Sequence, residues 1–140
     1  MRFLLDTNVL SELVKRTPDP RVVAWMDSQS SLDLMVSVLT LGELVKGVRS
    51  MPVSSRRDAL EHWVSVELPS QLVGRLLAVD AAVSAAWGTL AAAAARSGRG
   101  LPVIDGLLLA TASANDLVFA TRNLRDCAGR GVEVVDPWAS

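Results

Sequence analysis

The sequence predicts an α/β fold in which a central, mostly parallel sheet is flanked by helices on both faces, an α/β/α sandwich. Continuously apolar runs occur at Phe3–Leu5, at Leu34–Val36, which Ser37 follows, and at Leu117–Ala120. Such runs are typical of strands that are buried on both faces of a parallel sheet. Longer stretches with helical spacing separate them, as expected for crossover helices.

Composition restricts the class of protein. The 140 residues fit one domain, residues 1–140, and half of them are hydrophobic. The 14 Lys and Arg nearly balance the 15 Asp and Glu, so any nucleic-acid binding must be local. One cysteine excludes an internal disulfide, no signal-peptide pattern precedes the first strand, and no apolar run reaches the roughly 20 residues that span a bilayer. We therefore expect a cytoplasmic protein without a membrane partner.

The first apolar run ends abruptly at Asp6. Val9, Leu10 and Leu13 then follow helical spacing, and Thr7 can cap that helix. A carboxylate at the carboxyl end of an inner strand stands in the crevice where open α/β sheets bind ligands. The alternative is that Asp6 only caps the helix.

Glu43 lies in the helix that follows the second predicted strand. Asp19 and Pro20 predict the start of an earlier helix, and residues 38–48 predict the helix that holds Glu43. The apolar residues of the helix over residues 38–48 form a stripe on the opposite side from Glu43, namely Leu41, Leu44, Val45 and Val48. Glu43 is therefore either a solvated surface residue or a residue that faces the crevice.

The middle of the chain predicts two helices. One starts after Ser54 and runs to about Glu67, and Pro69 ends the pattern. Residues 71–78 form an apolar segment of undecided structure, after which Asp80 caps a long helix over residues 81–96.

A second apolar run ends in a carboxylate near the C-terminal third of the chain. Residues 101–104 predict a strand that stops at Asp105, where the next helix begins. The strand at residues 117–120 ends in a polar turn with Asn123 and Asp126, and residues 132–135 predict the last strand.

Carboxylates from several crossovers of one parallel sheet converge only at the carboxyl ends of the strands. Mutual repulsion would raise their proton affinity unless a cation lay among them. Oxygen ligands without a cysteine or histidine cluster favour Mg²⁺ or Mn²⁺ over Zn²⁺. The corresponding chemistry is phosphoryl transfer with a metal-activated water, although separate helix caps would also explain each acid.

The order and spacing of these motifs resemble the PIN-domain ribonucleases, specifically the VapC toxins of bacterial toxin–antitoxin pairs and their FitB-like branch. The resemblance covers essentially the whole chain. The motifs that carry it are Leu4-Leu5-Asp6-Thr7-Asn8-Val9-Leu10-Ser11, Gly42-Glu43-Leu44, Asp105-Gly106, Ala120-Thr121-Arg122-Asn123 and Asp136-Pro137-Trp138.

The resemblance implies an endoribonuclease with a defined set of site residues. Asp6, Glu43 and Asp105 would hold Mg²⁺ or Mn²⁺ for in-line cleavage of RNA, leaving 5′-phosphate and 3′-hydroxyl ends. The fourth position is either Asn123 or Asp126, because relatives place an acid at one or the other. The resemblance implies that Thr7 and Thr121 orient the ligands or the water.

The resemblance also implies partners. These are an RNA substrate, a VapB-like antitoxin that blocks the acidic pocket, promoter DNA bound through the toxin–antitoxin complex, and a second copy in a homodimer. An alternative function is that of a PIN-fold subunit that acts mainly in such a DNA-binding complex and has little nuclease activity. A dinucleotide-binding enzyme is set aside because no glycine fingerprint follows the first strand.

Four arginines are candidate contacts for RNA phosphates: Arg49, Arg99, Arg122 and Arg125. Each is equally explained as a plain surface charge. The identity of the RNA is left open, with transfer RNA and ribosomal RNA as the two candidates.

Overall fold

Five parallel strands form the centre of the fold in the computed structural model, which describes residues 1–139. The strands are β1 (Phe3–Leu5), β2 (Leu34–Ser37), β3 (Leu76–Leu77), β4 (Val118–Ala120) and β5 (Val134–Val135). Their order across the sheet is β3-β2-β1-β4-β5, and each neighbouring pair is parallel. The predicted α/β class with a parallel sheet is therefore confirmed.

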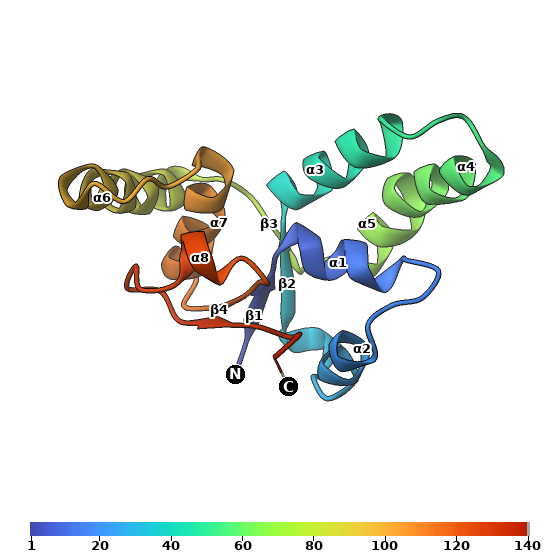
Figure 1. The fold of residues 1–140 in the computed structure, drawn as a ribbon, viewed down its shortest axis with the longest axis horizontal. Coiled ribbons are helices and arrows are strands. Elements are labelled where there is room, and N and C mark those ends of the chain that lie inside the picture. The colour runs from blue at the N-terminus through green and yellow to red at the C-terminus, as the bar shows by residue number, and fades with distance from the viewer. Residues whose placement is uncertain (140) are drawn as a thin grey trace.

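Helices cover both faces of this sheet (Figure 1). On one side lie α1 (Thr7–Leu13), α2 (Pro20–Asp27), α3 (Val38–Arg49), α4 (Ser55–His62) and α5 (Leu68–Gln71). On the other lie α6 (Ala81–Ser97), α7 (Val103–Ala114) and α8 (Leu124–Cys127). A 3-10 turn, η1 (Ser31–Asp33), precedes β2, and a π turn, η2 (Trp63–Glu67), joins α4 to α5. Among residues 1–139, no helix is both long enough and apolar enough to cross a membrane.

The strand side chains alternate between two apolar clusters, one on each face of the sheet. Phe3 and Leu5 pack with the α1 to α5 side, whereas Leu4 packs with Phe119 and Leu108 on the α7 side. All five are buried. Because successive strand residues point to opposite faces, apolar residues at every position of β1 are what a sheet covered on both sides requires.

The chain changes direction across the sheet next to β1. It runs from β1 to β2 and β3 on one side and then returns to place β4 on the other side of β1. The carboxyl ends of β1 and β4 are tied together, since the Asp6 N–H donates to the Ala120 carbonyl at 2.9 Å. A reversal of this kind leaves a crevice beside the strand ends, and Asp6 lies there.

The prediction of a strand at residues 101–104 is wrong. Helix α7 already begins at Val103, after Pro102 at the N-cap, and Val103 is 60% exposed. The fixed φ of proline suits a helix start, and an exposed valine is not the buried strand residue that the apolar run suggested. The fifth strand of the sheet is instead β3. It lies within residues 71–78, the segment for which the sequence predicted no definite structure, and its Leu76 pairs with Val36 of β2.

Pro69 does not end the helical segment, contrary to the sequence prediction. The predicted helix runs through α4 and the π turn η2, and Pro69 then lies in the first turn of α5. A first-turn proline is tolerated because its missing N–H has no partner within the helix there. The long helix is confirmed, with Asp80 accepting from the Val83 N–H at 2.9 Å.

Candidate metal centre

Asp6 both caps helix α1 and lies buried beside the end of β4. One carboxylate oxygen accepts from the Thr7 N–H at 2.7 Å. The other accepts from the Thr121 hydroxyl at 2.7 Å and from the Asn8 amide at 3.3 Å. The capping alternative therefore holds in part, but an ordinary cap is solvated, whereas Asp6 is only 5% exposed.

Burial is the main influence on the ionisation of Asp6. It raises the pKa of the carboxyl group from 3.8 to about 6, although the hydrogen bonds from Thr121 and Thr7 lower it. The nearby charges of Asp105 and Glu43 raise the pKa further. A bound cation would remove this penalty, because it favours the ionised carboxylate.

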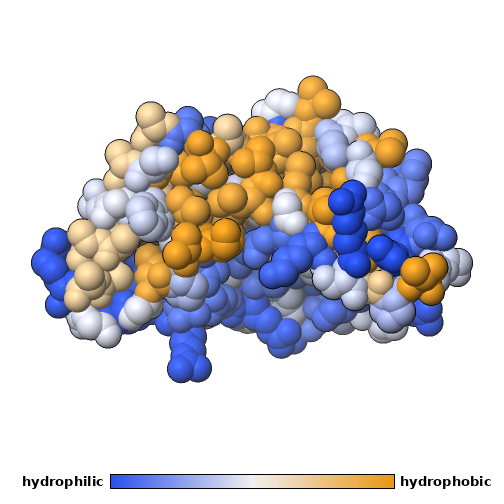
Figure 2. Space-filling model, turned by 90° about the horizontal axis from the view of Figure 1, so that it is seen from above, coloured by the Kyte–Doolittle hydropathy of each residue, from blue (hydrophilic) through white to orange (hydrophobic). Residues whose placement is uncertain are grey.

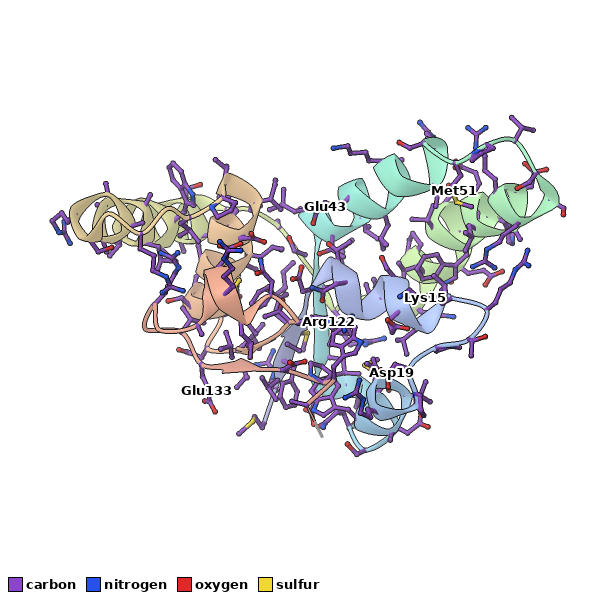
Figure 3. The ribbon with its side chains drawn as sticks, viewed as in Figure 1. Lys15, Asp19, Glu43, Met51, Arg122 and Glu133 are labelled. Carbon is purple, nitrogen blue, oxygen red and sulfur yellow. The ribbon has the colours of Figure 1, made fainter. Side chains whose placement is uncertain are left out.

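Glu43 faces Asp6 and is not a freely solvated surface residue. Its side chain is half-buried, and Oε1 accepts from the Thr7 hydroxyl at 2.6 Å. Thr7 thus links two acids, since its N–H binds Asp6 and its hydroxyl binds Glu43. Figure 3 shows Glu43 at the start of α3, above α1 in that view.

Asp105 enters the same region from the first turn of α7. Burial raises its pKa, and the charges of Asp126 and Glu43 raise it further. The next residue, Gly106, allows α7 to approach α6 closely, because a Cβ there would lie 3.2 Å from Trp87 and from Leu101. Gly106 thereby contributes to the placement of Asp105.

Asn123 connects two carboxylates on the other side of the region. Its amide nitrogen donates to Asp105 at 3.3 Å and to Asp126 at 3.2 Å. Its side-chain oxygen caps α8, accepting from the Asp126 N–H at 3.4 Å. The Asn123 N–H donates to Thr121 at 3.0 Å, so the turn after β4 is tied to the hydroxyl that holds Asp6.

This geometry leads to different expectations for Asn123 and Asp126. For the ribonuclease that the resemblance implies, we expect Asn123→Ala to reduce RNA cleavage modestly, by about tenfold, because Asp105 loses a hydrogen-bond donor that orients it. We expect Asp126→Asn to weaken Mn²⁺ affinity, because it removes a negative charge that acts on Asp105. Mn²⁺ titrations and melting curves of both variants measure these effects. An Asp126→Asn protein that binds Mn²⁺ and cleaves RNA like the parent, but melts earlier, would show that Asp126 only stabilises the turn.

The structure brings five of the seven predicted site residues to one open cavity of about 440 Å³. Asp126 does not line it, and Thr121 is linked to it through hydrogen bonds with Asp6, Asn8 and Asn123. The lining residues are Asp6, Thr7, Asn8, Ser11, Glu12, Lys15, Glu43, Asp105, Arg122, Asn123 and Trp138.

The donor chemistry of the cavity fits a hard divalent cation. Within residues 1–139, no three acidic, histidine or cysteine side chains already surround one point as ligands. Mg²⁺ does not need such a cage, because it keeps several waters and is commonly held by one or two carboxylates. Asp6, Glu43 and Asp105 would supply these carboxylates. The Asn8 side-chain oxygen, buried without a hydrogen-bond donor among the described residues, adds another oxygen of the type that Mg²⁺ prefers.

The sequence did not predict the part of the cavity that lies beyond Asp6, Glu43 and Asp105. This part is lined by Ser11, Glu12, Lys15 and Trp138. Glu12 is 5% exposed, and its carboxylate accepts from Lys15 at 2.9 Å and from the Asp19 N–H at 3.1 Å. Helical spacing was the available signal. Ser11 and Glu12 stand four residues after Thr7 and Asn8, so they continue the same face of α1.

The four candidate phosphate-binding arginines differ in their surroundings. Arg122 lines the cavity, and Arg49, Arg99 and Arg125 do not. Arg49 pairs with Glu61 at 3.4 Å. Arg99 donates to the carbonyls of Ala128 and Arg125, both at 2.7 Å, so its guanidinium supports the end of α8.

Comparisons with known proteins agree with this fold. Residues 3–126 match the PIN domain family. The chain is 37% identical over 136 residues to VapC ribonuclease Y4jK of Sinorhizobium fredii, covering 97% of both chains. It is 33% identical to Toxin FitB of Neisseria gonorrhoeae, covering 97% of this chain and 98% of that one.

Solved structures of similar sequence have the same fold. The chain superposes on the FitAcB crystal structure from Neisseria gonorrhoeae with a TM-score of 0.93 and 33% identity, covering 99% of each chain. For DNA-bound VapBC from Salmonella typhimurium, the TM-score is 0.82 and the identity 25%, covering 98% of each chain.

A parallel α/β/α sandwich with carboxylates gathered in one cavity beside the end of β1 defines the structural class of this protein. The chain belongs to the PIN-domain family, in the group whose members are named VapC and FitB.

Proposed function

We propose that this chain is a Mg²⁺- or Mn²⁺-dependent endoribonuclease and the toxin of a type II toxin–antitoxin pair. One observation carries the proposal. Asp6, Glu43 and Asp105 come from three separate crossovers and line one cavity, and the pKa values of Asp6 and Asp105 are raised. Raised carboxylate pKa values in a cleft indicate a functional site. The names of the VapC and FitB relatives support the same activity.

The three carboxylates would hold the cation, and neighbouring side chains would fix their orientation. When bound, Mg²⁺ or Mn²⁺ activates a water and neutralises charge on the attacked phosphate. The Thr121 hydroxyl holds Asp6, the Thr7 hydroxyl holds Glu43, and the Asn123 amide holds Asp105. Each carboxylate therefore keeps a defined orientation.

The proposed reaction is in-line hydrolysis of an RNA phosphodiester. The water oxygen forms a bond to phosphorus on the side opposite O3′, and the bond between phosphorus and O3′ breaks. A proton ends on O3′, so the products carry a 5′-phosphate and a 3′-hydroxyl. Asn123 contributes hydrogen bonds but no charge, and its role is to orient Asp105 and water.

The proposed partner is a VapB-like antitoxin that places a cationic residue in the acidic cavity. The resemblance to chains in the FitAcB and DNA-bound VapBC structures supports such a partner, and promoter DNA would be bound through the complex.

A homodimer is also proposed. Figure 2 shows apolar side chains gathered over the middle of the face toward which the strands run. The first turns of α3, α7 and α8 carry exposed apolar residues, namely Val38, Val103, Ile104 and Leu124.

Purified, antitoxin-free protein tests this proposal. We expect it to cleave RNA with Mg²⁺ or Mn²⁺ and to leave 5′-phosphate ends, and we expect the cognate antitoxin to suppress cleavage because it fills the cavity. Sequencing of RNA ends after brief induction in cells, beside an Asp6→Asn control, would locate the cleavage sites. Light scattering and pull-down from native cells test the dimer and the small partner.

The alternative function, a subunit of a DNA-binding complex with little nuclease activity, predicts a different result. The folded chain would then leave transfer and ribosomal RNA intact with either cation, and only its complex with the antitoxin would bind promoter DNA. That outcome would contradict the ribonuclease proposal.

A further inference from the structure

The cavity contains one cation, Arg122, that forms no close ion pair within residues 1–139. Its charge acts on the Asp19 carboxylate only at longer range, because Arg21 forms the ion pair with Asp19 at 2.8 Å. Of the lining residues, only Lys15 and Arg122 are basic. Lys15 forms an ion pair with Glu12 at 2.9 Å. Arg122 is exposed, and its guanidinium makes no hydrogen bond or ion pair within the described part of the chain, although its backbone carbonyl accepts from the Leu124 N–H at 2.9 Å. Its guanidinium therefore keeps its N–H donors available to a ligand.

Although the Arg122 guanidinium has no hydrogen-bond partner, it packs over an aromatic ring. Its guanidinium carbon lies 5.2 Å from the centre of the Trp138 ring. Trp138 is 4% exposed, and its backbone N–H donates to Asp136 at 2.9 Å, so the ring is fixed. A guanidinium over an aromatic face is attracted by the ring, and its N–H groups still point outward in their own plane.

The backbone at Arg122 is attached directly to the acidic residues. The preceding residue, Thr121, holds Asp6, and the following residue, Asn123, holds Asp105. The Thr121 N–H also donates to the Val135 carbonyl at 2.9 Å, which fixes this turn against β5. Figure 3 shows Arg122 below α1 and Glu43 above it, so the cavity extends from the acids to a cationic side.

The charge of the cavity explains why a ligand would need this arginine. Asp6, Glu12, Glu43 and Asp105 all line the cavity, and their carboxylates repel an RNA backbone. An arginine presents paired donors that match two oxygens of a phosphate.

We infer that Arg122, held over Trp138, binds an RNA phosphate next to the one cleaved at the carboxylates. This inference rests on the proposed function, because it assumes an RNA chain that crosses the acidic part of the cavity. Arg122 is then a substrate-binding residue. Arg49 and Arg99 are not equivalent to it, because Glu61 and the α8 carbonyls occupy their guanidinium groups.

RNA binding by a non-cleaving protein tests this inference without metal. The probe is a short, fluorescein-labelled, single-stranded RNA of mixed sequence, titrated with Asp6→Asn protein in chelator at several salt concentrations. Adding Arg122→Met keeps an apolar side chain over Trp138 but removes the charge. We expect about tenfold weaker binding at low salt, and a salt dependence shallower by about 0.7 in the logarithmic slope, as for one lost phosphate contact with a single strand.

Two further variants separate the charge from its surroundings. Arg122→Lys retains a point charge and should recover part of the affinity and of the salt slope. Arg125→Met is the matched control, because Arg125 is an exposed arginine on the adjacent α8 that does not line the cavity. Its affinity should stay within about twofold of the Asp6→Asn protein. If Arg122→Met does not fold, as judged by its melting curve, Arg122→Gln replaces it.

Unchanged affinity and salt slope in Arg122→Met would overturn the inference, as would no measurable RNA binding by the Asp6→Asn protein. Failure of the proposed function is read separately, from the absence of RNA cleavage by the parent. Binding that depends on Arg122 in a protein that does not cleave would support the phosphate site and contradict only the ribonuclease proposal.

Discussion

Replacing Asp6 with asparagine should reduce RNA cleavage by about 100-fold or more, because the cation loses an anionic ligand worth several kcal/mol in the transition state. The fold should persist. The new amide side chain would still offer one oxygen to the Thr7 N–H, which donates to the Asp6 carboxylate at 2.7 Å in the parent. Rates of cleavage and a circular dichroism spectrum of the variant measure both expectations.

The same variant should be at least as stable as the parent at neutral pH without metal. Folding raises the pKa of Asp6 from 3.8 to about 6, so the folded state binds the proton more tightly than the unfolded state. Stability from this group is therefore lost as pH rises from about 3.8 to about 6, and the full penalty remains above that range. In chelator, the melting temperature of Asp6→Asn minus that of the parent should therefore increase as the pH is raised from about 3.8 to about 6.

Asp80→Asn is the control for both measurements. Asp80 caps a helix, as Asp6 does, but it is exposed and does not line the cavity. It should cleave RNA like the parent. Undiminished cleavage by a folded Asp6→Asn protein would contradict the assignment of the site.

Removing divalent metal should abolish RNA cleavage, and adding Mg²⁺ or Mn²⁺ should restore it. Because protons compete with the cation for Asp6, cleavage at limiting Mn²⁺ should fall as pH drops through about 6. Higher Mn²⁺ should recover activity at low pH and shift the midpoint downward. The raised pKa of Asp105 acts in the same direction. Rates measured over a grid of pH and Mn²⁺ test this, and cleavage that persists in excess chelator would contradict it.

Local patterns predicted the sheet and most helices because the decisive forces there are local or repeat along the chain. The apolar run of β1 and the capping residues Asp6 and Asp80 are examples. The misassigned strand at residues 101–104 shows the limit. Apolar Val103 and Ile104 lie on the surface at the start of α7, and an apolar run does not reveal whether it is buried.

The cavity could be predicted only in outline. Strand ends placed Asp6 there, but Glu43 was open to two interpretations, since helical spacing shows only that it lies away from the apolar stripe. The Thr7 hydrogen bond to Glu43 joins residues 36 positions apart and depends on how α3 packs against α1. Likewise, Asn123 and Asp126 were equivalent candidates until the turn after β4 placed Asn123 in the cavity and left Asp126 outside it.

Titration of Mn²⁺ into the parent and the Asp6→Asn protein at neutral pH, followed by calorimetry, tests the central claim most directly. If the acidic cavity binds a catalytic cation, the parent will bind Mn²⁺ and Asp6→Asn will bind it at least about tenfold more weakly. No Mn²⁺ binding by the folded parent, or equal binding by the two proteins, would contradict the claim.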